Sequence, residues 1–513
     1  MNDLERLSHR FAALHRLFPE IPVLVIPWLH LKHPVHPIQE ALLNGDPAPP
    51  SPRMLDRLLG LVRLLGYAGY LDFRILQMRF LFRRELALLR GQRFHLVAKT
   101  WVFYPDSFKK VQDRDFYYGD LQEQLKEQGI QLLLLLADPM GKNWEARPFR
   151  ERPSDTHWRI PEVCLVPLWA PFRLAFRQWR LSSHLVRKAV AMEEPLLKKV
   201  ALHASGELLS PGLLPVGLSF WVGGETVKRY RPAAFLTLYE GHGWEQSLLR
   251  GIKSQDPGCL TVGYQHSILL RHHLALLRPQ EADAGFLRPD VVLCLGPRTL
   301  RFLRASHPKS ILIPFGSLRQ VAKQKELCSP SPRKKTVLVL PEGFLEEERL
   351  LFEAALEAAT QLQDHRFILR CHPCHPFDQV RPYLKRDPAR FPNVEISDRS
   401  TLEEDFEQSS VVLYRGTAAV LQGVLEGLKP IYLEIPGGWD IDPLFELARW
   451  KERVLGGGPL LGSLQRYGKA DSEACTEWKE AVEYVRSYTL AVAESALDDF
   501  LKTVGVPQRR GHV

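Results

Sequence analysis

The stretch that decides the fold runs from residue 336 to residue 436. It contains five short apolar runs: TVLVLPE (336–342), RFILRCHP (366–373), NVEISD (393–398), SVVLYRG (410–416) and PIYLEIP (430–436). Segments with helical spacing separate these runs, the longest at 345–363. Short, continuously apolar strands that alternate with helices are typical of a parallel sheet covered on both faces. The stretch therefore predicts a doubly wound α/β domain.

The same alternation is present earlier in the chain. Further apolar runs lie at FHLVAKTWVFYP (94–105), IQLLLLLADP (130–139), 234–239, 260–265, 291–295 and 311–314, with predicted helices between them. The polar segment VAKQKELCSPSPRKK (321–335) has the composition of an interdomain linker. We therefore predict a helical N-terminal extension over 1–92, α/β domains over 93–320 and 333–470, and a C-terminal helix over 471–505 that packs back on the first domain.

The composition is that of a large globular protein. Of the 513 residues 45% are hydrophobic and 25% are charged, which excludes a disordered or fibrous chain. The formal net charge of +9 favours anionic partners such as nucleotides or phosphorylated lipids. Seven scattered cysteines and the absence of a secretory signal pattern predict a cytoplasmic protein.

The N-terminal extension leaves two interpretations open. Leucine and arginine recur at helical spacing through Arg84, after the proline-rich break at 47–52. One interpretation is a basic helix pair that binds a membrane surface or a partner. The other is a packed extension with solvated arginines. A spanning helix is excluded because charged residues, among them Arg57, Arg63, Asp72, Arg74 and Arg79, interrupt the apolar stretch at 55–82.

Open α/β sheets bind ligands at the carboxyl ends of their strands, so we expect both sheets to contribute to a shared cleft. In RFILRCHP, Arg370 and His372 suit a phosphate, and Pro373 fixes the turn. Gly343, after the first strand of the second domain, belongs to the same predicted site. His372 as a simple turn cap is the alternative. Zinc on the neighbouring cysteines and histidines lacks a second ligand pair, so we predict no metal.

A second turn of this domain has a phosphate-binding pattern. Arg415, Gly416, Thr417 and Ala418 connect a strand to a helix, and helix N-termini offer free backbone N–H groups to a phosphate. Gly416 allows close backbone approach, and Thr417 supplies a hydroxyl and a cap. An ordinary Thr-capped helix is the alternative.

The first domain supplies the candidate acid–base groups. Glu240 follows a strand and is positioned to deprotonate an acceptor hydroxyl, although a carboxylate there also suits the dipole of the next helix. His266, at the end of another strand, is predicted to orient donor or acceptor, and a loop-facing histidine without such a role is the alternative. The chain lacks the P-loop, the GxGxxG fingerprint, HExxH and GxSxG, and no segment resembles a nucleic-acid-binding module, so we expect no nucleic-acid partner.

These motifs resemble those of known families. The turn at His372 and Pro373 and the later RGTAA turn (415–419) resemble the HP and Ser/Thr motifs of bacterial sialyltransferases, polysialyltransferases, Kdo transferases and CDP-polyol phosphotransferases. In those families the motifs hold the phosphate of the nucleotide. LYEGHGWEQSLL (238–249), GYQHS (263–267) and RPDVVLCLGP (288–297) resemble a family of bacterial surface-carbohydrate biosynthesis proteins. The layout from 93 to 505 looks like a GT-B glycosyltransferase.

The resemblance implies a cytoplasmic GT-B glycosyltransferase of capsule or lipopolysaccharide assembly. It would transfer an acidic sugar, Kdo or a nonulosonate, from a CMP donor to a glycan or lipid-linked glycan, without cofactor or metal, in peripheral contact with the inner membrane. Gln422 stands where many related enzymes place a ribose-binding Glu, which favours a CMP donor. Tyr239 replaces the first acid of the polysialyltransferase pair. The rivals are a polyol-phosphate transferase or sugar-nucleotide epimerase on the same fold, and a non-catalytic assembly protein.

Overall fold

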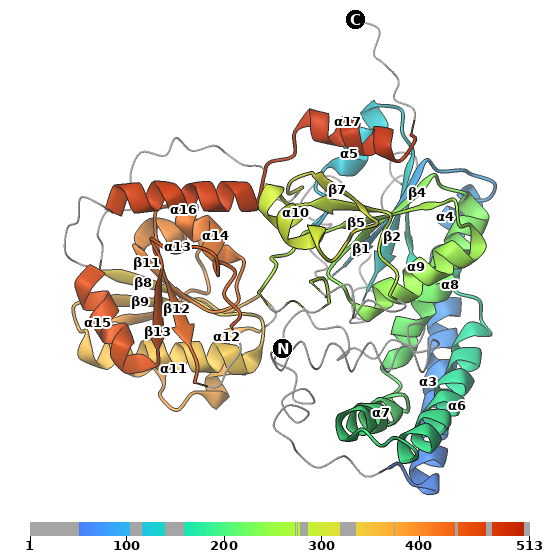
Figure 1. Ribbon diagram of the computed structural model, residues 1–513, viewed down its shortest axis with the longest axis horizontal. Coiled ribbons are helices and arrows are strands. Elements are labelled where there is room, and N and C mark those ends of the chain that lie inside the picture. The colour runs from blue at the N-terminus through green and yellow to red at the C-terminus, as the bar shows by residue number, and fades with distance from the viewer. Residues whose placement is uncertain are drawn as a thin grey trace, which may run out of the picture. The chain divides into compact units, whose positions relative to one another are not determined.

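The computed structural model describes residues 51–102, 115–138, 158–271, 273, 275–277, 286–318, 335–373, 375–436, 440–467 and 474–506. The chain forms two compact units (Figure 1). Unit 1 contains Met1–His266, His273–Ala322 and Leu490–Val513, and unit 2 contains Ser267–His272 and Lys323–Thr489.

Unit 1 is built on a seven-stranded parallel sheet with the order β3-β2-β1-β4-β5-β6-β7. The strands are β1 (Leu96–Trp101), β2 (Leu132–Ala137), β3 (Trp158–Pro161), β4 (Ala234–Leu238), β5 (Leu260–Tyr264), β6 (Val291–Cys294) and β7 (Ile311–Pro314). The strand order reverses between β1 and β4, so the ends of these two strands mark the topological switch point. The predicted doubly wound sheet is confirmed, with β3 as an additional edge strand.

Helices cover both faces of this sheet. The helices are α3 (Met54–Leu81), α4 (Arg83–Leu88), α5 (Leu121–Glu127), α6 (Ala170–Val190), α7 (Pro195–Glu207), α8 (Leu213–Tyr230), α9 (Gly243–Gln255), α10 (Pro297–Arg304) and α17 (Glu494–Thr503). One core joins the sheet to α3, α6, α7, α8 and α9. The core of the opposite face includes residues of α5 and α17. The predicted N-terminal helices are present as α3 and α4, and residues 1–50 lie outside the described ranges.

Unit 2 has a six-stranded parallel sheet with the order β10-β9-β8-β11-β12-β13. Its strands are β8 (Thr336–Leu340), β9 (Arg366–Leu369), β10 (Val394–Ile396), β11 (Val411–Tyr414), β12 (Lys429–Glu434) and β13 (Glu452–Leu455). The order reverses between β8 and β11. The five predicted strands are confirmed, and β13 adds a sixth.

The helices of unit 2 are α11 (Leu345–Gln361), α12 (Phe377–Val380), α13 (Leu402–Gln408), α14 (Ala419–Leu425), α15 (Gly457–Tyr467) and α16 (Ala474–Tyr488). Helix α12 is short, because Pro382 cannot continue an α-helix and a 3₁₀ turn over Arg381–Tyr383 follows it.

The C-terminal segment divides between the two units. The sequence predicted one helical segment over 471–505 on the first domain. Instead, α16 belongs to unit 2, where Trp478 Nε1 donates to the Val424 carbonyl at 2.8 Å. Residues from Leu490 onward belong to unit 1, and α17 packs Leu497, Phe500 and Leu501 into its core. No helix among the described residues is long and apolar enough to cross a membrane.

Candidate functional site

The turn after β4 carries a carboxylate between two imidazoles. Glu240 Oε2 lies 2.8 Å from His242 Nε2, and Glu240 Oε1 lies 3.7 Å from His266 Nε2. The side chain of Glu240 is 16% exposed and that of His242 is 37% exposed, whereas His266 is nearly buried. The structure therefore brings the two predicted catalytic residues together at the switch point of the first sheet, and it adds His242.

A buried carboxyl group fixes this turn. Glu245 is fully buried, and its two oxygens each accept a backbone N–H at 2.9 Å, from Glu240 and from Gly241. Gly241 has φ +80°, and a Cβ there would lie 2.5 Å from the Cβ of Ala275, so only glycine fits. Burial raises the pKa of Glu245 to about 7. This role of Glu245 was not predicted from the sequence, although a glutamate at the third position of a helix is a known capping signal.

The other histidines near this turn have structural partners. His273 Nε2 donates to the Glu240 carbonyl at 3.0 Å. His307 Nε2 lies 2.8 Å from the Tyr239 hydroxyl, and burial lowers the pKa of His307 to about 3. The neutral His307 ring is thus part of the support for β4. The Tyr117 ring packs on His266 with centroids 4.8 Å apart.

In unit 2, three strand-to-helix turns converge at the switch point. A Cβ on Gly343 would lie 2.8 Å from Nδ1 of His372, so the imidazole lies directly against this glycine. Gly416 has φ +66°, and a Cβ there would lie 2.7 Å from Oε2 of Glu342. The turns after β8, β9 and β11 thus meet around two glycines. Glu342 also belongs to this group, although no sequence pattern singled it out.

Arg415 does not have the predicted orientation. Its side chain is 1% exposed and forms an ion pair with Glu347 of α11. It also donates to the Leu433 carbonyl at 2.8 Å. The guanidinium of Arg415 therefore lies in the interior of unit 2, because its partner Glu347 is buried there. From this buried position it stabilises the turn after β11. Next to it, Thr417 Oγ1 accepts the N–H of Ala419 at 3.3 Å, and Ala418 is exposed at the start of α14.

Arg370 is likewise part of a polar network. It donates to Asp405 at 2.6 Å, to Ser397 at 2.9 Å and to the Ser400 carbonyl at 3.0 Å. Asp405 is buried, so this ion pair ties β9 to α13. Arg370 was predicted to present its charge to a phosphate. Instead, its guanidinium is bound to Asp405, Ser397 and Ser400.

The turn after β9 has a second buried carboxylate. Glu348 Oε1 accepts the backbone N–H of His372 at 3.1 Å and lies 3.5 Å from His375 Nδ1. Burial raises the pKa of Glu348. Pro373 is exposed, and Cys374 lies outside the described residues. Within the described ranges no group of three or more His, Cys, Asp or Glu side chains could hold a metal ion.

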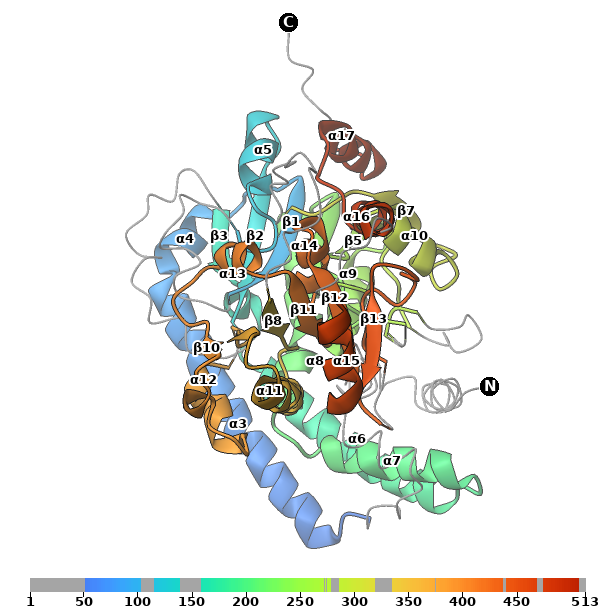
Figure 2. The ribbon, with the colours of Figure 1, turned by 90° about the vertical axis from the view of Figure 1, so that its left-hand side faces the viewer.

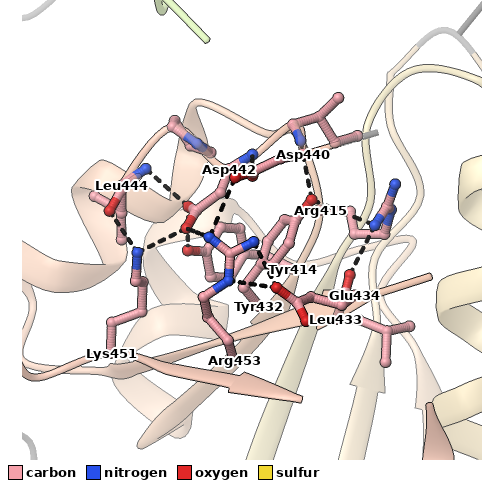
Figure 3. Close-up of polar contacts among 12 residues, drawn as sticks. Tyr414, Arg415, Tyr432, Leu433, Glu434, Asp440, Asp442, Leu444, Lys451 and Arg453 are labelled. Atoms are coloured by element: carbon pink, nitrogen blue, oxygen red, sulfur yellow. Dashed lines mark hydrogen bonds and ion pairs between the residues drawn. The ribbon is translucent and has the colours of Figure 1, made fainter. Parts of the chain in front are cut away.

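A charged network holds the segment between β12 and β13 beside Gly416 (Figure 3). Asp442 is buried, accepts from Tyr414 at 2.6 Å and pairs with Lys451 at 2.7 Å. Arg453 pairs with Glu434 at 2.6 Å and reaches Asp440 at 3.3 Å. The burial of Asp442 and Lys451 is offset by their pairing with each other. The network therefore fixes one wall of the turn that contains Gly416.

No protein-family model matches the chain, and no curated protein matches it. Solved structures with a similar fold include the glycosyltransferase of kitacinnamycin. It is 14% identical, with a TM-score of 0.44, and the match covers 80% of this chain and 99% of that one. Anabaena HepE in complex with UDP and glucose has 12% identity, TM-score 0.42, and coverage of 81% and 100%. UDP-GlcNAc 2-epimerase from Neisseria meningitidis has 11% identity, TM-score 0.45, and coverage of 80% and 100%. All three TM-scores lie below 0.5, and the two parallel sheets themselves define the fold.

Proposed function

We propose that this chain is a glycosyltransferase that uses a nucleotide-sugar donor. The observation that carries the proposal is the content of the two switch points. One sheet ends in a carboxylate hydrogen-bonded to an imidazole, Glu240 with His242. The other ends in glycine-lined turns against the ring of His372. The first arrangement suits proton transfer, and the second suits a phosphate group.

In this proposal, unit 2 binds the donor. His372 donates a hydrogen bond to the phosphate, and the turn from Gly416 to Ala418 approaches it with backbone N–H groups and the Thr417 hydroxyl. Gly343 and Gly416 leave room because they carry no side chain. Glu342 accepts from a ribose hydroxyl. Pro373 holds the His372 turn, and Arg370 and Arg415 act indirectly through the ion pairs that position the turns.

Unit 1 supplies the acid–base group. Glu240 and His242 act as one unit that takes the proton of the acceptor hydroxyl, with the carboxylate stabilising the imidazolium that forms. His266 orients the sugar from the other side of Glu240. The meeting of these groups with the donor in a shared cleft stays a prediction.

The donor that we propose is a CMP-linked acidic sugar, and the acceptor is a surface glycan or its lipid-linked precursor. The basic net charge and the glutamine at position 422 support this choice. HepE was solved with UDP and glucose, so UDP-sugars are the principal rivals. A carboxylate between two imidazoles also suits the abstraction of a carbon-bound proton, which keeps a sugar-nucleotide epimerase as the second candidate.

Product analysis tests the proposal. The purified chain is incubated with CMP-Kdo, CMP-sialic acid, UDP-GlcNAc or CDP-glycerol and a glycan acceptor, and both nucleotide and glycan products are resolved. We expect release of CMP together with an extended glycan. Conversion of UDP-GlcNAc without transfer would identify an epimerase, and nucleotide binding without any product would identify a non-catalytic protein.

A further inference from the structure

The outward side of α3 is apolar, although α3 already buries its opposite side. Gly60, Leu64, Ala68, Ile75 and Met78 face the core. Because successive residues of a helix are rotated by about 100°, a second set of side chains points away from the core. That set is large, apolar and 46–67% exposed: Leu55, Leu58, Leu59, Val62, Tyr70, Phe73, Leu76 and Phe80.

Aromatic residues at the start of α6 and directly before it extend this surface. Trp169, Phe172 and Phe176 are 41–52% exposed. A Cβ on Gly69 of α3 would lie 3.9 Å from Cζ of Phe172, and α3 and α6 lie side by side in both views (Figures 1 and 2). We call these eleven residues the α3–α6 apolar face. Single exposed apolar residues are ordinary, but a contiguous group of this size marks an interaction surface.

The charges around the α3–α6 apolar face are predominantly positive. Helix α6 contains five cationic residues and no acidic one: Arg173, Arg177, Arg180, Arg187 and Lys188. Helices α3 and α4 contain six arginines against Asp56, Asp72 and Glu85. The guanidinium of Arg83 lies 4.6 Å from the ring centroid of Phe80, and that of Arg173 lies 5.4 Å from that of Trp169. Cations therefore border the aromatic rings directly.

We propose that the α3–α6 apolar face binds the surface of an anionic phospholipid bilayer. Aromatic and leucine side chains would enter the headgroup boundary, and the surrounding arginines would attract lipid phosphates. The charges exclude a second copy as the better partner, because two such faces would bring like charges together. The helices lie on the bilayer in this proposal, which agrees with their failing the requirements for a span.

The role that we give this surface rests on the proposed function, because membrane binding would bring the enzyme to a lipid-linked acceptor. The vesicle-binding test does not depend on the proposed function, because the assay contains no nucleotide. The full chain is sedimented with vesicles of phosphatidylcholine alone, or of phosphatidylcholine with phosphatidylglycerol. We expect binding to the anionic vesicles only, weakened by salt. Absence of binding at low salt would overturn the proposal and leave the proposed function untouched.

Three double variants, one of them a control in unit 2, locate the surface. Phe73→Ser with Phe80→Ser should weaken vesicle binding at least about tenfold. Tyr383→Ser with Leu455→Ser, which are 56% and 52% exposed in unit 2, should not change it. Arg173→Gln with Arg180→Gln should weaken binding about 30-fold, because each cation near an anionic surface contributes about 1 kcal/mol. Circular dichroism checks that each variant is folded.

Two results would contradict the assignment of this face. One is equal vesicle binding by the wild type and the Phe73/Phe80 variant. The other is a wild-type dimer in sedimentation velocity that the same variant converts to a monomer, since that would identify the face as a contact between copies.

Discussion

Glu240 owes its position to a second glutamate. The buried Glu245 accepts the N–H groups of Glu240 and Gly241, so the side chain of Glu240 leaves a rigid turn and reaches His242. Such support is what a proton-transfer group needs, because its efficiency depends on hydrogen-bond geometry. At the scale of single residues, the acid–base proposal therefore involves three side chains with separate tasks.

Replacing either member of the pair should slow transfer. We expect Glu240→Gln and His242→Gln each to lower kcat by roughly 10²–10⁴-fold, the usual contribution of general acid–base catalysis. Nucleotide affinity should stay unchanged, because the donor turns belong to unit 2. The measurement is steady-state transfer with calorimetry of nucleotide binding, and Glu225→Gln on the surface of α8 is the control. Unchanged rates in both variants would remove Glu240 and His242 from the mechanism.

Because the pKa of Glu245 is raised, we expect the stability of the folded protein to depend on pH. Its pKa is about 7 in the folded protein against an ordinary 4.5, because burial disfavours the charged form. The folded state then holds a proton that the unfolded state has released. Its stabilising contribution is complete below about pH 4.5 and is lost as the pH rises through about 7, by up to about 3 kcal/mol in the free energy of unfolding.

Glu245→Gln tests this sign. Denaturant unfolding, followed by the fluorescence of the adjacent Trp244, is measured across that pH range for the wild type and the variant. The decline with rising pH should be smaller in the variant. An equal decline in both proteins would show that another group causes it.

At the scale of elements, the turn after β11 depends on backbone shape. Gly416→Ala introduces a Cβ at φ +66° against Glu342, so we expect destabilisation of about 1–3 kcal/mol and loss of nucleotide binding. Gly458→Ala in α15 is the matched control, because nothing lies within 4 Å of its Cβ. Thermal unfolding and calorimetry measure both effects. A Gly416→Ala protein that binds nucleotide normally would show that this turn does not approach the ligand.

The central strands could be predicted because each is a continuous apolar run that is buried on both faces, as in β2 and β8. The edge strands β3 (WRIP) and β13 (ERVL) could not, because they are short, only partly buried and contain charged residues. The positions of Glu240 and His372 at strand ends followed from the same pattern. The inward orientation of Arg415 did not, because its partner Glu347 lies 68 residues away in the sequence.

At the scale of the whole molecule, the chain leaves unit 2 after Thr489 and ends in unit 1. Phe500 of α17 is fully buried in the core of unit 1. Phe500→Ala should therefore cost unit 1 about 3–5 kcal/mol. Calorimetric unfolding should show the transition of unit 1 shifted to lower temperature and that of unit 2 unchanged. A shift of the unit 2 transition alone would contradict the assignment of α17 to unit 1.

Isothermal titration calorimetry of the full chain with CMP, UDP, GDP and CDP tests the central claim most directly, with His372→Ala beside the wild type. His365→Ala, at the opposite end of β9 and paired with Asp364, is the control. We predict selective binding of CMP by the wild type and by the control, and none by a folded His372→Ala protein. Retention of nucleotide binding in His372→Ala, or the absence of binding of any nucleotide to the wild type, would contradict a donor site at the switch point of unit 2.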